Sequence, residues 1–552
     1  MKFKINLKML VFFFTMAFFV RTAQANSPLF LLSSEIKTFN KQIESAPGKT
    51  LYVDGTQADI FVFRHSKNTI EVEATVEVSQ APSEMISEFF AQTRLVLEPY
   101  RDGFKLRLRT PRERYAHTDE SGLKRFFRAL FDDNRNLSMY VELRIGTPAK
   151  QSLVIDNKYG DIQIEDVEGD HEIENTSGEI KLERCAGSLE IHNNYAAVEV
   201  DEFVGDANIQ NRSGAVTLNK ITGDVRIKNS YKEIEFRNIA GRLIIDSQSA
   251  QIFGTGVAKD CDITSSYKEI NVADIGGKLV INGTSSEVSV TNVGAATIIE
   301  TSYKPIKVDS VGGSLKIISQ SSSVTASRIA GDTSIRTSYK TIRVENVNGN
   351  LDIDGNSCIV DVHDIQNDVS ISSSYKNITV ENVGGGLDIN GNSSSVLVKN
   401  VAKQASIRTS YKTIRIENVG GDLEVNGSSS SVLVDGAGGD VDISNSYKYV
   451  ILKRTSGSIQ VRGNNSPIEV SDIQRLPTGG RIELLTSYKT VTLSLPADAK
   501  VRVSAKTQYG KIHSDFPVFL VYDDEKYIQV ETGDANSTVR IETSSDIIIR
   551  KE

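Results

Sequence analysis

The tripeptide Ser-Tyr-Lys, or a close variant of it, recurs along this chain at a fixed interval of 36 residues. Neither an insertion nor a deletion interrupts the series, and a serine follows each of the first eight tyrosines after 18 residues. The tyrosines of the series are Tyr159, Tyr195, Tyr231, Tyr267, Tyr303, Tyr339, Tyr375, Tyr411 and Tyr447. Such regularity indicates stacked copies of one structural unit, because a stack cannot accommodate an extra residue in one copy.

Apolar residues alternate with polar ones in two short stretches of each half-repeat. In one repeat, Ile342 and Val344 form the first stretch, and Leu351 and Ile353 form the second. Alternation of this kind predicts half-buried strands, and no segment of the repeat has helical spacing. An 18-residue unit is too short for antiparallel hairpins with a core of their own, but it suits one turn of a parallel β-helix.

We therefore predict an all-β fold, a single-stranded right-handed parallel β-helix with 18-residue coils. The chain is long enough for about 20 such coils, and each coil adds one strand spacing to the length of the stack. The right hand is the usual one for parallel crossovers. The alternative is a β-propeller, whose blades need about 40 residues in four antiparallel strands. The 18-residue half-repeat disfavours that fold.

Glycine marks two recurrent places in the repeat. The tenth residue after every tyrosine of the series is glycine, as at Gly349, which predicts a corner with positive φ. A second corner is predicted at Asn-Gly or Asp-Gly pairs, namely Asn282-Gly283, Asp354-Gly355, Asn390-Gly391 and Asn426-Gly427.

The N-terminus predicts export. Lys2, Lys4 and Lys8 precede an apolar run from Met9 to Val20, and Ala23-Gln24-Ala25 resembles a cleavage site. This order is typical of a cleaved secretory signal over residues 1–25, and the apolar run is short for a membrane span. A retained membrane anchor is the alternative. We expect a periplasmic, cell-surface or extracellular protein with no transmembrane helix after cleavage.

The remaining chain divides into three regions. Residues 26–150 are predicted to form a β-rich capping region with two short helices. One helix follows Pro82 and runs to about Leu97, and the other covers Gly122–Asp132, where it closes the stack or docks on a membrane or partner. Residues 151–515 form the β-helix array, with an insertion near Gln474–Gly480, and residues 516–552 form C-terminal coils and a cap.

Charge and cysteine usage narrow the possible functions. Without residues 1–25 the chain has 59 Lys and Arg against 71 Asp and Glu, a net charge of −12. This balance argues against nucleic acid as a partner, since phosphate binding needs a basic surface. Cys185, Cys261 and Cys358 are odd in number and far apart, so we expect no disulfide framework.

The repeat resembles that of the bacterial putative-adhesin β-strand-repeat family. The resemblance lies in Tyr159-Gly160-Asp161-Ile162-Gln163-Ile164 through Gly169, and again in Tyr411-Lys412-Thr413-Ile414-Arg415-Ile416 through Gly421. It covers residues from about 140 to the C-terminus, and residues 45–80 more loosely. It implies a secreted β-helix with an adhesin-like role, and it brings no catalytic or binding residues to this chain.

The Tyr-Lys pairs are the candidate ligand track. Aromatic rings beside cations at a regular step suit a long acidic polysaccharide or another cell-envelope component. The alternative is that each tyrosine packs at a corner over the serine of the next coil, with its lysine solvated. The track comprises Tyr231, Lys232, Tyr267, Lys268, Tyr303, Lys304, Tyr339, Lys340, Tyr375, Lys376, Tyr411, Lys412, Tyr447 and Lys448.

Two classes of function remain from the sequence. The first is an exported, non-enzymatic β-solenoid that acts as an adhesin or as an envelope scaffold. The second is a β-helix carbohydrate-active enzyme, a polysaccharide lyase or hydrolase, which needs a local break in the repeat. The break at 465–488 offers Asp472, Arg475, Arg481 and Glu483. We predict the first class, with no catalytic residue, metal or cofactor.

Overall fold

The computed structural model describes residues 33–111, 138–518, 520–522 and 526–552. The chain divides into two compact units. The smaller comprises Met1–Thr38, Thr75–Arg94 and Arg109–Tyr140, and the larger comprises Phe39–Ala74, Leu95–Leu108 and Val141–Glu552. The predicted signal peptide and the predicted helix at Gly122–Asp132 lie outside the described residues.

The described part of the smaller unit contains one helix, α1 (Ser83–Gln92), which buries Ile86, Phe89 and Phe90. It starts where the sequence predicts, directly after Pro82, but it ends five residues before the predicted end at Leu97. Residues from Arg94 onward form β5 (Arg94–Tyr100) instead, because they pair with β6 (Gly103–Arg109). Tertiary pairing here overrides local helix propensity.

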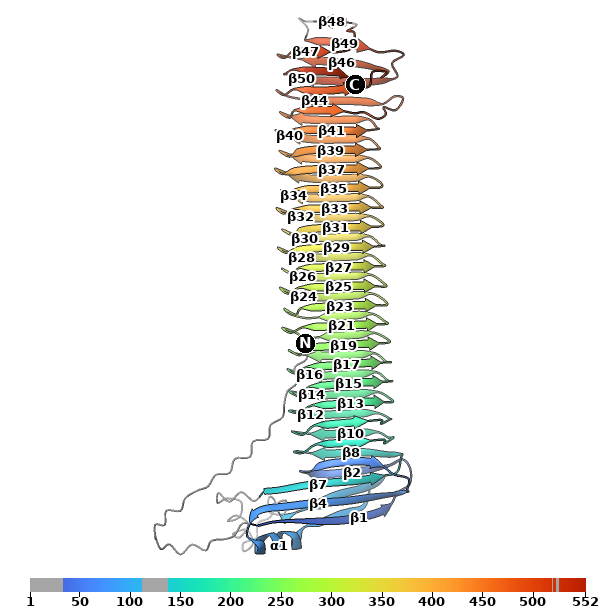
Figure 1. Cartoon of the computed structure of the whole chain (residues 1–552), viewed down its shortest axis with the longest axis vertical. Helices are drawn as coiled ribbons and strands as arrows, with labels where there is room; N and C mark the ends of the chain where they lie inside the picture. The colour runs from blue at the N-terminus through green and yellow to red at the C-terminus, as the bar shows by residue number, and fades with distance from the viewer. Residues whose placement is uncertain (1–32, 112–137, 519, 523–525) are drawn as a thin grey trace, which may run out of the picture. The chain divides into compact units, whose positions relative to one another are not determined.

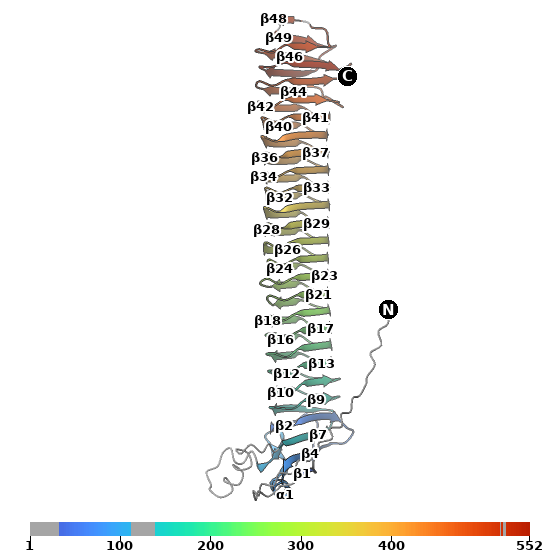
Figure 2. The same cartoon turned by 60° about the vertical axis from the view of Figure 1, so that its left-hand side comes forward.

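The larger unit is a parallel β-solenoid, so the predicted all-β parallel solenoid is confirmed. Each coil contributes one even-numbered and one odd-numbered strand, and each strand pairs in parallel with the equivalent strand 18 residues further on. Figures 1 and 2 show these coils stacked in register. From β8 to β43 the chain makes 18 two-strand coils at this spacing. The prediction of about 20 coils is not confirmed, because the regular 18-residue spacing covers only these coils.

The even-numbered strands of the array form one sheet and the odd-numbered strands form the other. The even strands are β8 (Gln151–Asn157), β10 (His171–Asn175), β12 (Leu189–Asn193), β14 (Ala207–Asn211), β16 (Val225–Asn229), β18 (Leu243–Ser247), β20 (Cys261–Thr264), β22 (Leu279–Asn282), β24 (Thr297–Ser302), β26 (Leu315–Gln320), β28 (Thr333–Ser338), β30 (Leu351–Asn356), β32 (Val369–Ser374), β34 (Leu387–Asn392), β36 (Ala405–Ser410), β38 (Leu423–Ser428), β40 (Val441–Ser446), β42 (Ile459–Asn464) and β44 (Arg481–Thr486). The odd strands are β9 (Ile162–Glu165), β11 (Ile180–Glu183), β13 (Val198–Phe203), β15 (Val216–Ile221), β17 (Ile234–Ile239), β19 (Ile252–Val257), β21 (Ile270–Ile275), β23 (Val288–Val293), β25 (Ile306–Val311), β27 (Val324–Ile329), β29 (Thr341–Val347), β31 (Ile359–Ile365), β33 (Ile378–Val383), β35 (Val396–Val401), β37 (Thr413–Val419), β39 (Ser431–Ala437), β41 (Val450–Thr455), β43 (Ile468–Ser471) and β45 (Val491–Leu495).

The core is the column of side chains between the two sheets. Ile342, Val344, Leu351 and Ile353 are each at most 1% exposed, as the alternation predicts. Cys185, Cys261 and Cys358 are free thiols buried in the same column, and burial raises the pKa of each. His171 takes an inward place as well, and burial lowers its pKa to about 4, so it is neutral at pH 7. Packing alone explains these four residues.

From β9 to β43, a bend that the sequence analysis missed lies in each odd strand or directly after it. One residue at the bend adopts positive φ, for example Asn346 (57°), Asp364 (56°) and Asn382 (61°). Asparagine and aspartate tolerate this left-handed conformation better than most residues, and they recur at this place. Their recurrence is the sequence signal that could have revealed the bend.

The predicted corner glycines have a different role from the one expected. Of the nine glycines that follow the tyrosines, only Gly169 and Gly205 have positive φ. Gly349 is required by close stacking, since a Cβ built on it would lie 2.4 Å from the backbone carbon of Gly331 in the preceding coil. The expectation of positive φ was therefore wrong at seven of the nine glycines, because the tight approach of neighbouring coils excludes a side chain there.

The Asn-Gly and Asp-Gly pairs also differ from expectation. Gly355 lies inside β30 and is buried, and the turn comes two residues later, at Ser357 (φ 57°). The same inward place holds Thr337 and Ser373 in the neighbouring coils, whose hydroxyls bond to the turn backbone, as in Ser373 Oγ to the Cys358 carbonyl at 3.1 Å. The glycine is thus a small inward residue and not a corner.

Strands from distant parts of the chain close both ends of the stack. At one end, β2 (Lys49–Thr56) lies between β6 and β8, and β3 (Asp59–Arg64) lies between β7 (Ser138–Thr147) and β9. At the other, β50 (Ser537–Thr543) lies between β44 and β46 (Val501–Thr507), and β51 (Ile547–Lys551) lies between β45 and β47 (Ile512–Ser514). The last coil of the chain is therefore inserted between two earlier ones.

The remaining four strands belong to the same two sheets. β49 (Tyr527–Glu531) pairs antiparallel with β46, and β48 (Leu520–Tyr522) pairs antiparallel with β49, so these two strands end the even-numbered sheet. Antiparallel additions of this kind cover a parallel edge that is otherwise open to aggregation. β1 (Ser33–Glu44) and β4 (Thr69–Ala81) pair near the N-terminus.

The predicted insertion is confirmed. Ile459 in β42 pairs with Ile482 in β44, an offset of 23 residues in place of 18. The extra five residues form part of the loop 472–480 between β43 and β44. The loop preserves the strand register on both sides, so the array continues unbroken past it.

Candidate binding surface

The Tyr-Lys pairs occupy the turn that joins every second even strand to the following odd strand. In seven successive pairs, from Tyr267 to Tyr488, the tyrosine has φ between 58° and 67°. The Lys340 amide donates a hydrogen bond to the Ser338 carbonyl (2.9 Å), and the Tyr339 amide donates to the Asn356 carbonyl of the next coil (2.9 Å). The backbone of the turn is thereby closed on itself and joined to its neighbour.

The tyrosine rings project from these turns. All nine tyrosines of the series are between 57% and 71% exposed. The hydroxyl of Tyr303 donates to Gln320 Oε1 in the next coil (3.2 Å). Serine takes the same backbone conformation in the alternate coils, as at Ser357 and Ser393 (both φ 57°). Neither burial nor backbone conformation therefore accounts for a large aromatic residue at this place.

The turns also share a charge. None of the eleven turns from Tyr303 to Thr490 contains a carboxylate, and six contain an exposed lysine. These lysines are Lys304, Lys340, Lys376, Lys412, Lys448 and Lys489. Further toward the N-terminus the turns lose this positive charge, since Glu233 and Glu269 directly follow Lys232 and Lys268. We call the eleven turns the Tyr-Lys row, a basic edge on an acidic chain.

The structure brings the predicted track residues into one row, at every second coil. Consecutive tyrosines are two coils apart, about 9.6 Å by strand spacing. The row extends beyond the predicted track to Tyr488 and Lys489, because β44 keeps register past the insertion. Tyr231, Lys232, Tyr267 and Lys268 lie at the equivalent turns, beside the carboxylates named above.

A second surface, which the sequence analysis missed, is a groove of about 1300 Å³ along the outer face of the even strands. It runs past β26 to β44, at the first residues of each strand. Its lining includes nine carboxylates and three cations, Lys316, Arg408 and Arg481. The carboxylates are Asp332, Asp352, Asp368, Asp388, Asp422, Glu424, Asp440, Asp442 and Glu483. We call this surface the acidic groove.

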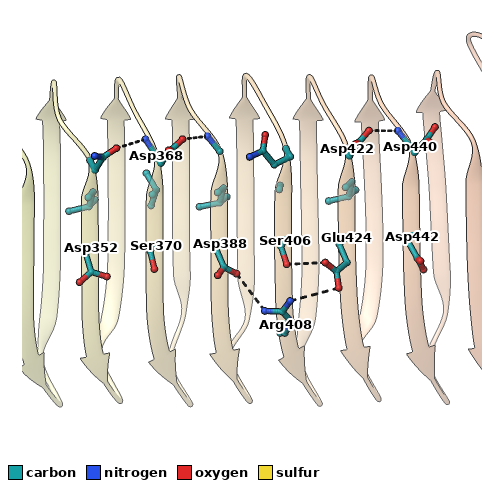
Figure 3. A pocket seen from close by; sticks show the side chains of 18 of the residues that line it. Asp352, Asp368, Ser370, Asp388, Ser406, Arg408, Asp422, Glu424, Asp440 and Asp442 are labelled. Carbon is teal, nitrogen blue, oxygen red and sulfur yellow. Dashed lines mark hydrogen bonds and ion pairs between the residues drawn. The ribbon is translucent and has the colours of Figure 1, made fainter.

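Two rows of side chains form the acidic groove (Figure 3). One row precedes the strands and accepts backbone hydrogen bonds from the next coil, as in the Gly386 amide to Asp368 (2.7 Å) and the Asp440 amide to Asp422 (2.8 Å). The other row points outward from the strands, with carboxylates two coils apart at Asp352, Asp388 and Glu424 and a further one, Asp442, in the coil after Glu424. The first row holds coils together, and the second is open to solvent.

Arg408 partly neutralises the outward row. Its guanidinium nitrogens lie 3.9 Å from Asp388 Oδ1 and 3.8 Å from Glu424 Oε1. All three side chains are at least half exposed, so these ion pairs contribute little to stability. The groove thus keeps a clear excess of negative charge.

The predicted break in the repeat does not assemble a reaction centre. Glu483 is 5% exposed, and its carboxylate accepts hydrogen bonds from Gln460 (2.8 Å), Arg481 (2.6 Å) and Arg540 (3.4 Å). Both of its oxygens are therefore engaged by neighbouring side chains. Asp472 lies in the loop 472–480, and its backbone amide donates a hydrogen bond to the Glu552 carboxylate (2.8 Å). These contacts join the insertion to the C-terminal coil.

His363 lies on the odd-numbered sheet, 2.7 Å from a carboxylate oxygen of Asp361 in the same strand and 3.6 Å from one of Glu381 in the next coil. Among the residues that the structure describes, no group of His, Cys, Asp and Glu side chains is placed to hold a metal ion. Within the same residues, no helix combines the length and apolar character that crossing a bilayer requires.

Comparison with known proteins finds distant structural likenesses. No protein-family model and no curated protein sequence matches the chain. Solved structures similar to it include a "putative adhesin" from Bacteroides fragilis (8% identity, TM-score 0.20, 58% of this chain and 97% of that one). Others are a "putative cell adhesion protein" from Clostridium sporogenes (12%, 0.18, 48% and 100%) and a "putative lipid binding protein" from Parabacteroides distasonis (11%, 0.12, 74% and 96%). The first two descriptions agree with the family that the sequence resembles, but likenesses this distant carry no argument about function.

Proposed function

We propose that this protein is an exported, non-enzymatic, adhesin-like β-solenoid that binds an extended acidic polysaccharide of a cell envelope along the Tyr-Lys row. The observation that carries the proposal is the conformation of the tyrosines. A bulky residue with positive φ is strained, and the small residues Ser321, Ser357, Ser393, Ser429 and Asn465 fill the same place in the alternate coils. Strain that packing does not require is typical of a functional position.

The chemistry of the row supports a polymeric acidic ligand. An exposed tyrosine offers an apolar face and a polar hydroxyl at little cost in conformational entropy, which suits contact with sugar rings. Each lysine supplies a flexible cation beside it for a carboxylate or sulfate group. Successive pairs repeat about every 9.6 Å along the row, so one extended chain contacts many of them. Once one Tyr-Lys pair has bound the polymer, its neighbours meet the same polymer at a high effective concentration, so weak single contacts add up to stronger binding.

A binding role accounts for the uniformity of the Tyr-Lys row better than catalysis does. An enzyme of this fold concentrates its reactive groups at one departure from the repeat. The candidate departure at 472–483 is held together by hydrogen bonds from arginine and glutamine to Glu483. The Tyr-Lys row instead repeats one set of groups without a distinct centre, which favours attachment to a long partner.

A glycan array tests this function, with the purified chain lacking residues 1–25. We expect binding to acidic polysaccharides and no release of reducing ends from them. The matched variant carries Tyr339→Ser, Tyr375→Ser and Tyr411→Ser, which copies the residue of the alternate coils and should keep the fold. We expect at least about tenfold weaker binding by this variant, a loss of about 1.4 kcal/mol, well below the free energy of burying three rings. Release of reducing ends, or unchanged binding by the variant, would contradict the proposal.

A further inference from the structure

The Tyr-Lys row and the acidic groove lie at opposite ends of the same strands. In β30, for example, the groove residue Asp352 is the second residue, and the turn follows directly after the last one, Asn356. A six-residue strand spans about 16 Å, so the two surfaces run side by side along one face of the stack. One surface is basic, and the other carries three times as many carboxylates as cations.

The two surfaces also share a period. Lys340, Lys376 and Lys412 are spaced by two coils, and so are Asp352, Asp388 and Glu424. Over these three steps the lysine ladder stays in step with the carboxylate ladder, and before and after them the equivalent places hold Lys316 and Gln460. Matched charge at a matched interval is what specific pairing of two surfaces requires.

We infer that the partner of the acidic groove is a second copy of this chain, which places its Tyr-Lys row there. Because row and groove share one face, two copies that face each other and are related by a two-fold axis make both contacts at once. Such an arrangement closes as a dimer and leaves neither surface unpaired. The projecting tyrosines enter the groove, and the lysines meet its outward carboxylates.

The available area is sufficient for a stable dimer. An aromatic side chain buries about 200 Å², so the exposed three-fifths of the five tyrosines beside the groove amounts to roughly 600 Å² in each row. These five are Tyr339, Tyr375, Tyr411, Tyr447 and Tyr488. The groove surface that the rings cover adds to this area. The second row–groove contact of the two-fold dimer adds to it as well. The total exceeds the roughly 1,200 Å² at which specific interfaces begin. Since the contacts are mostly charged and exposed, salt should weaken the dimer.

Charge reversal tests the inference by sedimentation velocity at low salt. The row variant carries Lys340→Glu, Lys376→Glu and Lys412→Glu, and the groove variant carries Asp352→Lys, Asp388→Lys and Glu424→Lys. We expect a dimer for the parent that dissociates as salt is added, monomers for each variant alone, and a heterodimer when the two variants are mixed. Circular dichroism and thermal unfolding confirm that both variants are folded.

The outcomes separate this inference from the proposed function. A parent that stays monomeric at low salt, a variant that still dimerises alone, or a mixture that stays monomeric would each overturn the inference. The groove variant retains the Tyr-Lys row, so it should still bind acidic polysaccharide. A parent that binds the polysaccharide but never dimerises refutes only the inference, and a dimer that binds no glycan refutes only the function. We further expect acidic polysaccharide to dissociate the parent dimer, because both ligands use the same row.

Discussion

A chain that ends at Asn536 is expected to lose the folded structure of its last coils while the rest of the array stays intact. Deleting residues 537–552 removes β50 and β51, and with them Val539, Ile541, Ile547 and Ile549, each at most 1% exposed. Burying one such side chain stabilises by about 1.5–3 kcal/mol, so the loss is on the order of several kcal/mol. The deletion also leaves an empty slot, because β44 and β46 do not pair with each other directly.

Limited proteolysis followed by mass spectrometry measures this effect. We expect cleavage of the truncated chain beyond about residue 470, with protection of the preceding coils, because solenoid stability is a sum over neighbouring repeats. A synthetic peptide of residues 537–552 should restore protection when it is added in trans. An unchanged cleavage pattern in the truncated chain would show that the inserted coil does not hold this end together.

Gly349→Ala is expected to destabilise the array by more than about 2 kcal/mol, the upper part of the range for overpacking. The added methyl group would lie 2.4 Å from the Gly331 carbonyl carbon, which is backbone and cannot move aside without shifting a coil. Gly391→Ala is the matched control, because its nearest neighbours are side-chain carbons 3.2 Å away and no backbone atom lies closer. Thermal unfolding of the two variants measures the difference.

Gly349→Asn distinguishes the two explanations for the glycine. Asparagine tolerates positive φ, so it would be milder than alanine if conformation were the reason. Steric exclusion predicts that asparagine is at least as damaging as alanine. Equal stability of the Gly349→Ala and Gly391→Ala variants would contradict the stacking explanation.

The regular part of the fold could be predicted because it depends on local periodicity. Alternation at Ile342, Val344, Leu351 and Ile353 indicates which residues face inward, and the constant spacing indicates parallel stacking. The ends could not be predicted in the same way. The pairing of Leu51 with both Phe104 and Leu153 joins segments that share no period, so no pattern in the sequence reveals it.

The candidate surfaces were predictable to different extents. The Tyr-Lys row follows directly from the repeat, but the exposure of its rings depends on the turn geometry at Tyr339 and its equivalents. The acidic groove was missed because its carboxylates belong to two different places in the repeat, such as Asp368 and Asp352. Only the stacking of successive coils brings these two series together as one surface.

The most direct test of the central claim measures binding of an acidic polysaccharide as a function of salt, for the parent and for a variant with Lys304, Lys340, Lys376 and Lys412 changed to glutamine. Folding should change little, because exposed charges contribute at most about 1 kcal/mol each. We expect the parent to bind at low salt and to weaken as salt is added, since screening acts on exposed charges. The variant should bind far more weakly and with a smaller salt dependence, because only Lys448 and Lys489 remain beside the tyrosines of the row. A parent that binds no acidic polysaccharide at low salt, or a variant that binds as the parent does, would contradict the account.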